Sequence, residues 1–460
     1  MKGDFKMAVE PKITTLTNSS VDIMNAIRNN ATVNYRNYVP VATNDSESLR
    51  TIGAVLMDSP QLQNEFISAL VNRIGRVILT SKMYSNPWAI FKKGLLEFGE
   101  TIEEIFVDIA KPFQYDPAVA ENNVFKREKP DVKSAFHIMN YQKYYKATVQ
   151  QNDLAKAFTS WSGVTDLIAK IVDAMYTGAN YDEYQTMKYM LATNIINGRL
   201  HPITVGAITP QNAKTIVSKI KATSNNMEFL NTVYNMSGVN NKADKNEQYI
   251  ILDSEFDAMI DVEVLASAFN MSKADFIGHR VLVDGFGNID NNRLSELFKD
   301  DTTYKEISES QKTALNKIPG IIVTADFFMM FDNLVNFTEQ YNGEGLYWNY
   351  WYHVWKTFSV SPFANAALFT VDNPTVTSVT VTPEAATIAI GGSIGLNVDV
   401  ATSNFAPKTV AWTSSNDKVT VSASGIVTVH EGASGTATIT ATSLYNNSVS
   451  DACTITIGSN

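Results

Sequence analysis

The chain has 460 residues, of which 45% are hydrophobic, so it can bury a large apolar surface and is too long for one ordinary compact core. Charged residues make up only 18%, and the formal net charge of -10 argues against sequence-specific binding to the phosphates of nucleic acids. The single cysteine, Cys453, excludes an intrachain disulfide, so stability must come from packing and from partners.

The first eleven residues mix charged and apolar positions and lack the continuous apolar core of a secretory signal. The most apolar stretch, residues 321–331, is interrupted by Thr324 and Asp326 and falls short of the roughly 20 residues that cross a bilayer. We therefore expect a soluble protein that is made and used in a cytoplasm.

Residues 76–83 and 102–109 have the composition of two strands, and Asn86-Pro87 and Lys92-Lys93-Gly94 lie between them. This pattern predicts a long hairpin with Lys92 and Lys93 at its tip. The return strand is acidic, through Glu100, Glu103, Glu104 and Asp108. Such segregated charge would suit contact with an oppositely charged patch on a neighbouring copy, and these six residues are the predicted subunit interface. The alternative is a solvated loop with scattered charge.

Three helices are predicted in the middle of the chain. Residues 161–175 carry apolar side chains at three- and four-residue spacing, which is typical of one buried stripe. A second helix, residues 182–196, ends at Asn197-Gly198, the usual residues for a left-handed C-cap. A third is expected over residues 255–269.

The composition changes near Pro374, after which Thr, Ser, Val, Ile, Ala and Gly dominate. Apolar and hydroxyl residues alternate with period two, which predicts half-buried strands over residues 376–381, 387–390, 396–400, 410–412, 419–421, 426–429, 436–442 and 453–457. Turn residues such as Gly391-Gly392 and Asn446-Asn447 separate them. Seven or eight short strands in this length predict a β-sandwich with Trp412 as its core anchor.

This C-terminal segment resembles the bacterial immunoglobulin-like group 2 module over residues 375–457. The resemblance rests on Ser378-Val-Thr-Val-Thr-Pro383, Ile390-Gly-Gly392, Val410-Ala-Trp-Thr-Ser-Ser415, Ser424-Gly-Ile-Val427 and Gly435-Thr-Ala-Thr-Ile-Thr-Ala441. In that family the module is a rigid display or adhesion unit without chemistry of its own, found on bacterial surface proteins and appended to phage structural proteins.

A second resemblance covers nearly the whole chain. It rests on Asp22-Ile-Met-Asn-Ala-Ile-Arg-Asn29, Tyr38-Val-Pro40, Arg73-Ile-Gly75, Phe91-Lys-Lys-Gly94, Thr101-Ile-Glu-Glu-Ile105, Gln114-Tyr-Asp116, Ala266-Ser-Ala-Phe-Asn-Met271, Gly345-Leu-Tyr-Trp-Asn-Tyr-Trp-Tyr-His-Val-Trp355 and Phe363-Ala-Asn365. In this order the segments resemble the major capsid protein of short-tailed, double-stranded-DNA phages of the phi-29 kind, whose shell domain has the fold named after phage Hong Kong 97. The last, aromatic block is the most distinctive.

The resemblance implies an α+β shell domain over residues 1–373 and an all-β immunoglobulin-like domain over residues 374–460. Within the shell domain it implies an N-terminal arm (1–70), an extended loop (about 75–115), a spine helix (about 160–177), an axial subdomain (about 205–340) and a return to the peripheral sheet (346–369). Residues 225–248 and 286–317 match the family poorly, so the subdomain details there remain open.

The resemblance also implies a function. Copies would form pentamers and hexamers of an icosahedral or prolate shell, the hairpin of each lying over an adjacent subunit and the arm along another. The implied partners are a scaffolding protein, a portal protein and packaged double-stranded DNA bound without sequence specificity; the module could in addition contact a host surface. The expected location is the virion, assembled in the host cytoplasm.

No residues are predicted to act in catalysis or to bind a cofactor or metal. The five histidines lack the spacing at which two imidazoles share a metal on a helix. Residues 288–292 begin like a calcium loop, but Arg293 and Lys299 occupy the glycine and glutamate positions. Residues 391–395 have no lysine or following helix to hold a phosphate, which favours a turn. Glu103 and Glu104 would point to opposite faces of a strand, and Cys453 is expected to be buried.

The aromatic block at residues 347–355 could stack on bases or sugars, but packing in a core or subunit interface is favoured. Two other classes of function stay open. One is a surface-displayed adhesion or glycan-binding protein that uses the immunoglobulin-like module, although this class needs an export signal. The other is an enzyme whose site is assembled from distant residues. Deleting the chain from Pro374 onward is predicted to leave a foldable shell domain.

Overall fold

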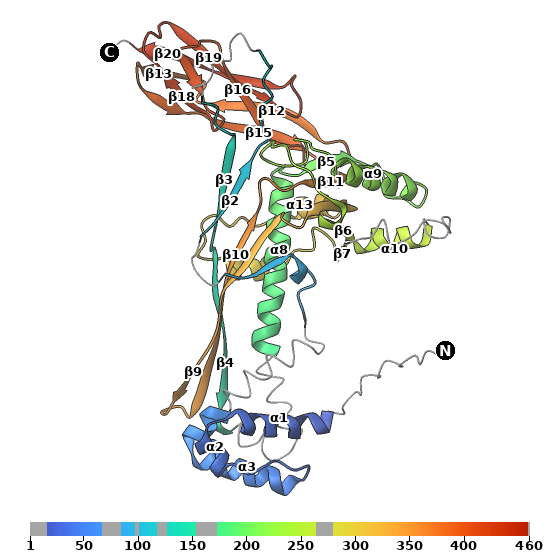
Figure 1. The fold of residues 1–460 in the computed structure, drawn as a ribbon, viewed down its shortest axis with the longest axis vertical. Coiled ribbons are helices and arrows are strands. Elements are labelled where there is room, and N and C mark those ends of the chain that lie inside the picture. The colour runs from blue at the N-terminus through green and yellow to red at the C-terminus, as the bar shows by residue number, and fades with distance from the viewer. Residues whose placement is uncertain are drawn as a thin grey trace.

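The computed structural model describes residues 16–66, 84–96, 101–116, 127–152, 173–263 and 279–458. Figure 1 shows an elongated subunit with an all-β module at one end and a body of helices and strands in the middle. From the body a long ribbon of strands runs down to a group of N-terminal helices at the opposite end. The predicted α+β shell domain and all-β C-terminal domain are both confirmed.

The body is built on a five-stranded sheet of order β5-β11-β8-β6-β7. Its strands are β5 (His201–Thr204), β6 (Gln248–Asp253), β7 (Arg280–Val283), β8 (Gly320–Thr324) and β11 (Ala366–Thr370). Every residue of β8 and β11 is buried, as their nearly continuous apolar sequences require. Helices α9 (Ala213–Asn226) and α10 (Ser254–Glu263) pack on one face, and α8 (Gly178–Ile196) covers the other. Two short helices, α12 (Asn291–Leu297) and α13 (Glu309–Leu315), complete the body.

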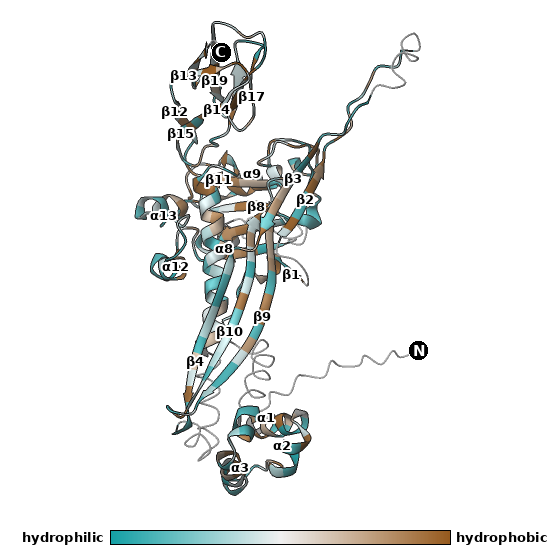
Figure 2. Ribbon diagram, turned by 90° about the vertical axis from the view of Figure 1, so that its left-hand side faces the viewer, coloured by the Kyte–Doolittle hydropathy of each residue, from teal (hydrophilic) through white to brown (hydrophobic). Residues whose placement is uncertain are grey.

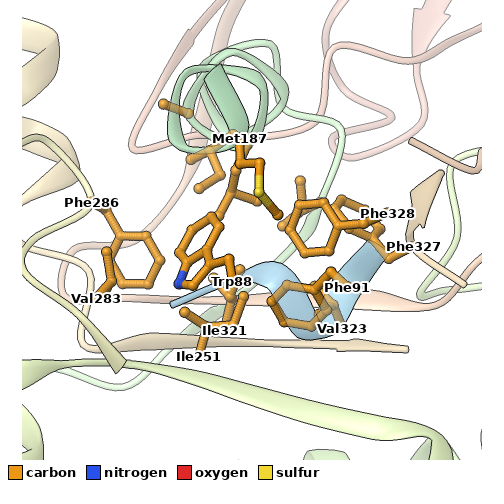
Figure 3. Close-up of a cluster of buried hydrophobic side chains, with 14 of the residues drawn as sticks. Trp88, Phe91, Met187, Ile251, Val283, Phe286, Ile321, Val323, Phe327 and Phe328 are labelled. Atoms are coloured by element: carbon orange, nitrogen blue, oxygen red, sulfur yellow. The ribbon is translucent and has the colours of Figure 1, made fainter. Parts of the chain in front are cut away.

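A second, four-stranded sheet of order β1-β9-β10-β4 forms the long ribbon. It consists of β1 (Lys92–Leu95), β4 (Tyr141–Gln150), β9 (Phe328–Asn342) and β10 (Tyr347–Val360). At about 3.4 Å per residue, β9 and β10 span roughly 50 Å. Trp88 fills the junction between this ribbon and the body, and Figure 3 shows its indole between Met187 on α8 and the strand residues Ile251 and Ile321. The body and the inner half of the ribbon therefore share one core.

The described part of the N-terminal arm is helical. It comprises α1 (Leu16–Asn30), α2 (Val33–Tyr38), α3 (Ser46–Asp58) and a further helical stretch at residues 60–66. The side chains of Thr32 and Asp45 cap α2 and α3 by accepting backbone hydrogen bonds. The helices share a core cluster with Trp348 and Tyr350 at the far end of the ribbon. Residues 16–66 thus pack on their own chain, and the contact of the arm with another subunit that the resemblance implies stays a prediction.

Strand β2 (Thr101–Val107) pairs with β3 (Val132–Ile138) in an antiparallel hairpin. This differs from the predicted pairing with residues 76–83, which lie outside the described residues. The two arms continue beyond the strands to residues 116 and 127, and Figure 2 shows them projecting far from the body. A hairpin that projects was thus predicted, but its described arms are residues 101–116 and 127–138 and not the two sides of a loop at about 75–115.

The C-terminal module has nine strands with a core of its own. They are β12 (Thr375–Thr382), β13 (Ala385–Ala389), β14 (Ser393–Gly395), β15 (Asn397–Ser403), β16 (Val410–Ser414), β17 (Val419–Val421), β18 (Ile426–Val429), β19 (Thr436–Ser443) and β20 (Ser450–Gly458). All eight predicted strands are present, and β14 lies in the predicted turn at 391–395. Trp412 is only half-buried beside Gly425, whereas Val427, Ile439 and Ile455 are fully buried, so the tryptophan lies at the edge of the core.

The predicted helix at 182–196 is confirmed as α8, which ends at Asn197 with Gly198 at a φ of +65°. The helix predicted at 255–269 is described up to residue 263. Of the predicted stripe at 161–175, only the last residues are described, in a π-helical turn (Asp173–Thr177) that leads into α8. Within the range 205–340 expected for an axial subdomain, β6, β7 and β8 lie in the body sheet and β9 lies in the ribbon, while β11, at the end of the expected return to the peripheral sheet, pairs in the body. The subdomain bounds stay a prediction.

Candidate assembly surfaces

The projecting hairpin has one face that the body covers and one that it leaves open. Residues directly opposite in β2 and β3 lie on the same face, and alternate residues change face. The outer hairpin face consists of Thr101, Glu103, Ile105, Val107, Val132, Ser134, Phe136 and Ile138. Five of these eight are large apolar residues, and Phe136 and Ile105 are 61% and 59% exposed. An apolar row of this kind on a projecting element is typical of a surface that a partner covers.

The inner face of the hairpin is fixed to the body. Glu104 accepts hydrogen bonds from Ser361 at 2.7 Å, and its carboxylate lies 3.1 Å from Nε2 of the buried His137. The ring of Phe106 stacks on Phe363 with centroids 5.5 Å apart. Asp108 accepts a hydrogen bond from Asn240 at 3.0 Å, and this bond is the main reason that the pKa of Asp108 is lowered. The outer face is therefore presented in one fixed orientation.

The ribbon also has one open face. Helix α8 packs on the side that carries Tyr145 and Lys356, and the opposite side shows alternate residues of three strands. This open sheet face consists of Gln142, Tyr144, Lys146, Thr148 and Gln150 on β4, Tyr347, Asn349, Trp351, His353 and Trp355 on β10, and Leu334, Asn336, Thr338, Gln340 and Asn342 on β9. A half-buried aromatic row thus lies between two rows of amides and hydroxyls.

The open sheet face carries no carboxylate, although the whole chain has 47 acidic residues. Its one ammonium group, that of Lys146, lies 5.6 Å from the ring centroid of Trp351. Uncharged polar groups around an aromatic row suit contact with an apolar, amphipathic strand pair, because few charges would have to be desolvated. The open sheet face runs over nine residues along each of its strands, and the outer hairpin face runs over seven, so the hairpin face fits within its length.

A buried network of charges fixes the ribbon to α8. Nζ of Lys356 lies 2.7 Å from Asp332 and also contacts Glu183, which is 3% exposed. Nζ of Lys92 lies 3.2 Å from Glu183 and 2.8 Å from Asp332. Asn86 donates a further hydrogen bond to Glu183 at 2.7 Å. Two ammonium groups and two carboxylates therefore balance where β1, β9, β10 and α8 meet.

The network shifts the pKa values of Glu183, Asp332 and Lys356 in the directions that keep these groups charged. Burial alone would raise the pKa of Glu183, but the ammonium groups of Lys356 and Lys92 outweigh it and lower that pKa. The same balance lowers the pKa of Asp332. Burial would lower the pKa of Lys356, and the two carboxylates raise it instead.

These shifts predict the pH dependence of stability. A carboxyl group whose pKa is lower in the folded than in the unfolded chain contributes stability above its unfolded pKa, about 4, and loses it as the pH falls through the folded value. We therefore expect the midpoint of thermal unfolding, measured by circular dichroism, to fall steeply on acidification below about pH 4. Asp244→Asn, which changes an exposed pair with Lys242, should leave this profile unchanged. A flat profile between pH 6 and 3 would contradict the role of the network.

A second polar contact ties α8 to α12. Asp182 is fully buried and receives two hydrogen bonds from Arg293, at 2.7 and 2.9 Å, and one from the hydroxyl of Tyr145 at 2.7 Å. The hydrogen bond with Asp182 is the main reason that the pKa of Arg293 is raised. Helix α8 is thus held to β4, β10 and α12 by directional contacts.

Of the six residues predicted as a subunit interface, the five that the structure describes lie in different surroundings. Lys92 and Lys93 were expected at a projecting tip, but they lie in β1 against the body, where Lys92 joins the buried network and Lys93 pairs with Asp326. Glu104 and Asp108 bind the body, as described above. Glu103 alone points outward, on the opposite face of the strand from Glu104, as predicted. Glu100 lies outside the described residues.

The apolar residues of the outer hairpin face were missed in the sequence. Their signal was present only in part, because Val132, Phe136 and Ile138 share one face of a strand but Ser134 and Ala135 interrupt the alternation. The pairing of β2 with this segment puts two such rows side by side. The aromatic block at 347–355 divides by face: Trp348 and Tyr350 are buried, whereas Trp351 and Trp355 lie on the open sheet face.

Within the described residues, no three His, Cys, Asp or Glu side chains gather as metal ligands would. The Asp284–Asp290 loop is organised by the ammonium of Lys188, which donates to Asp284 and to the carbonyl of Asn288, both at 2.6 Å. Cys453 is buried, as predicted. No helix in the described ranges is both long enough and apolar enough to cross a membrane.

Comparison with known proteins agrees with this architecture. The model of the Phi29-like phage major capsid protein family matches residues 24–370, and that of the bacterial Ig-like domain (group 2) matches residues 375–455. The major capsid protein of Bacillus phage B103 is 36% identical over 431 residues, which cover 92% of this chain and 90% of that protein. The major capsid protein of Streptococcus phage Cp-1 is 28% identical over 368 residues, covering 77% of this chain and 95% of that protein.

A solved structure extends the comparison to the fold. One chain in the structure of the head fibre and inner core protein of native bacteriophage P68 is similar with a TM-score of 0.50 at 15% identity, covering 63% of this chain and 86% of that chain. The matches over most of the sequence decide the family. The chain belongs to the Phi29-like phage major capsid protein family and carries a C-terminal bacterial Ig-like domain of group 2.

Proposed function

We propose that copies of this chain assemble into the closed icosahedral or prolate shell of a phage head, with the outer hairpin face of each copy seated on the open sheet face of its neighbour. As a phage capsid protein the chain is a structural component of the virion. The single observation that carries the proposed contact is the apolar row on a hairpin that projects away from its own body.

The exposed apolar row supports a contact in which a second copy of the chain covers it. Five large side chains exposed to water on one strand pair are costly, at about 25 cal/mol per Å² of apolar surface. The hairpin cannot fold back over its own open sheet face, because its inner face is bonded to the body through Glu104 and Phe106. A second copy can supply that surface, and repeating the contact generates rings.

Charge supports the same pairing. Glu103 is the only charged residue on the outer hairpin face, and Lys146 is the only lysine on the open sheet face. Seating one face on the other would bring one carboxylate toward one ammonium and would bury no like-charged pair. Each contact is modest, but every subunit makes several, so neighbours reinforce one another in a closed shell.

The remaining partners follow from the same role. Assembly would take place in the host cytoplasm, with a scaffolding protein setting the curvature and a portal protein admitting the DNA. The net charge of -10 opposes premature collapse of free subunits onto nucleic acid. Packaged double-stranded DNA would then be enclosed without sequence-specific contacts. No catalytic step is required of the chain in this role.

Electron microscopy tests the proposal. The chain, expressed together with the scaffolding protein of its phage, is expected to give closed particles or rings of subunits in negative stain. The comparison sample is the same chain at low concentration without scaffold. Monodisperse monomers at high concentration with scaffold present would overturn the proposed assembly.

A further inference from the structure

The immunoglobulin-like domain is joined to the shell domain by a very short connection. Strand β11 ends at Thr370 in the middle of the body, and β12 of the module begins at Thr375. The carbonyl of Thr370 accepts a hydrogen bond from the backbone of Val205 at 2.8 Å, so the body holds the chain up to the last residue of β11. Four residues then separate the two domains, which leaves little freedom for a hinge.

A loop of the module reaches back across this connection. Between β15 and β16, Asn404 and Phe405 adopt φ angles of 50° and 64°, which residues other than glycine rarely do. The turn directs the ring of Phe405 away from the core of the module and onto the main core cluster of the shell domain. The next residue, Ala406, is fully buried and belongs to the core cluster of the module. Of two adjacent residues, Ala406 thus lies in the core of the module and Phe405 packs against the core of the shell domain.

The loop lies directly against the end of α8. A Cβ atom built on Gly198 would lie 2.3 Å from the carbonyl oxygen of Ala406 and 3.0 Å from Cα of Pro407, so only glycine permits this approach. The side chain of Asn404 donates a hydrogen bond to the carbonyl of Asn373 in the linker at 2.9 Å. The ammonium of Lys317 lies 3.8 Å from the carboxylate of Asp372. The loop, the linker and the end of α8 therefore form one contact region.

We infer that the immunoglobulin-like domain is a fixed brace on the shell domain, held in one orientation by Phe405 at the C-terminal end of α8, and is not a tethered decoration. This inference goes beyond the proposed assembly and does not depend on it, because the contact lies within one chain. It also changes the expectation for a truncated chain. A chain that stops near residue 373 would fold with part of the shell core uncovered at the end of α8.

The inference is tested on the full chain with Phe405→Ala. The matched control is Ile426→Ala. Ile426 is an exposed apolar residue of the module, lies far from the shell domain in sequence and belongs to none of the shell domain's core clusters. The readout is the rate at which an aspartate-specific endoprotease cleaves before Asp372, because this cleavage requires the linker to open. Mass spectrometry detects the released module. We expect Phe405→Ala to be cleaved about tenfold faster than the parent chain and Ile426→Ala to match the parent.

Two further measurements keep the test decisive. Phe405→Leu retains part of the apolar contact and should give an intermediate rate, which also covers the case in which the alanine variant folds poorly. Hydrogen exchange at the amide of Arg199, which donates to the carbonyl of Asn194 at the end of α8, should accelerate in parallel. Equal cleavage and exchange in the parent, Phe405→Leu and Phe405→Ala chains would show a freely tethered module and overturn the inference.

Discussion

Replacing Phe136 by glutamate is expected to leave the subunit folded and to abolish the formation of closed particles. The side chain lies on the outer hairpin face and is 61% exposed, so the monomer tolerates a carboxylate there. In the proposed contact the same carboxylate would be buried against an aromatic row next to Glu103, at a cost of several kcal/mol. A cost of about 3 kcal/mol raises the dissociation constant of one contact more than a hundredfold, and the effect multiplies over the contacts of each subunit.

The measurement is sedimentation velocity of the variant and the parent chain, each expressed with scaffold, with circular dichroism as the check on folding. Ile426→Glu places the same charge on an exposed apolar residue of the module and should assemble like the parent. If Phe136→Glu gave particles in the parent's yield, the outer hairpin face could not be an assembly surface.

Replacing Lys356 by methionine should destabilise the shell domain by about 3–5 kcal/mol, because removal of one member of a buried ion network leaves its partners without balancing charge. The lysine is 9% exposed and faces both Glu183 and Asp332. Methionine has nearly the same shape as lysine, so the loss of stability would come from the missing charge and not from a change in side-chain volume. The readout is the urea midpoint of the shell-domain transition, followed separately from the module because two domains need not unfold together.

A double variant tests whether the loss of stability comes from unbalanced charge. Combining Lys356→Met with Glu183→Met leaves Lys92 and Asp332 as a balanced pair 2.8 Å apart and should recover most of the stability. Lys242→Met, in an exposed pair, should change the midpoint by no more than about 1 kcal/mol. A single Lys356→Met variant as stable as the parent would rule out the network as a stabilising feature.

The immunoglobulin-like domain could be predicted almost strand by strand. Each of its strands has one face toward the core of a small sandwich and one toward solvent, so apolar and polar residues alternate in the sequence. Besides the short β14 in the predicted turn, the error was Trp412: a large aromatic residue was assumed to fill the centre, which is occupied by smaller residues such as Val427 and Ile439. Helix α8 was predictable for a similar local reason, since Asn197-Gly198 marks its end.

The assembly surfaces were harder to predict from the sequence, because they depend on pairing between distant segments. Lys92 is 91 residues from Glu183 in the sequence, and nothing local indicates that the lysine is drawn into a buried network instead of pointing outward from a tip. Likewise, β2 has the composition of a strand, but its partner at residues 132–138 could not be inferred from period two alone. Once that pairing is known, the face on which Ile105 and Phe136 lie follows directly.

Covalent capture of the contact between two copies tests the central claim most directly. One chain carries Ser134→Cys on the outer hairpin face, a second carries Lys146→Cys on the open sheet face, and the two are assembled together and treated with a short bismaleimide. The native Cys453 is fully buried and should not react. We predict a cross-linked dimer of one chain of each kind in closed particles, and none in free subunits or when Ile426→Cys replaces the sheet cysteine. Closed particles that yield no such dimer would contradict the account.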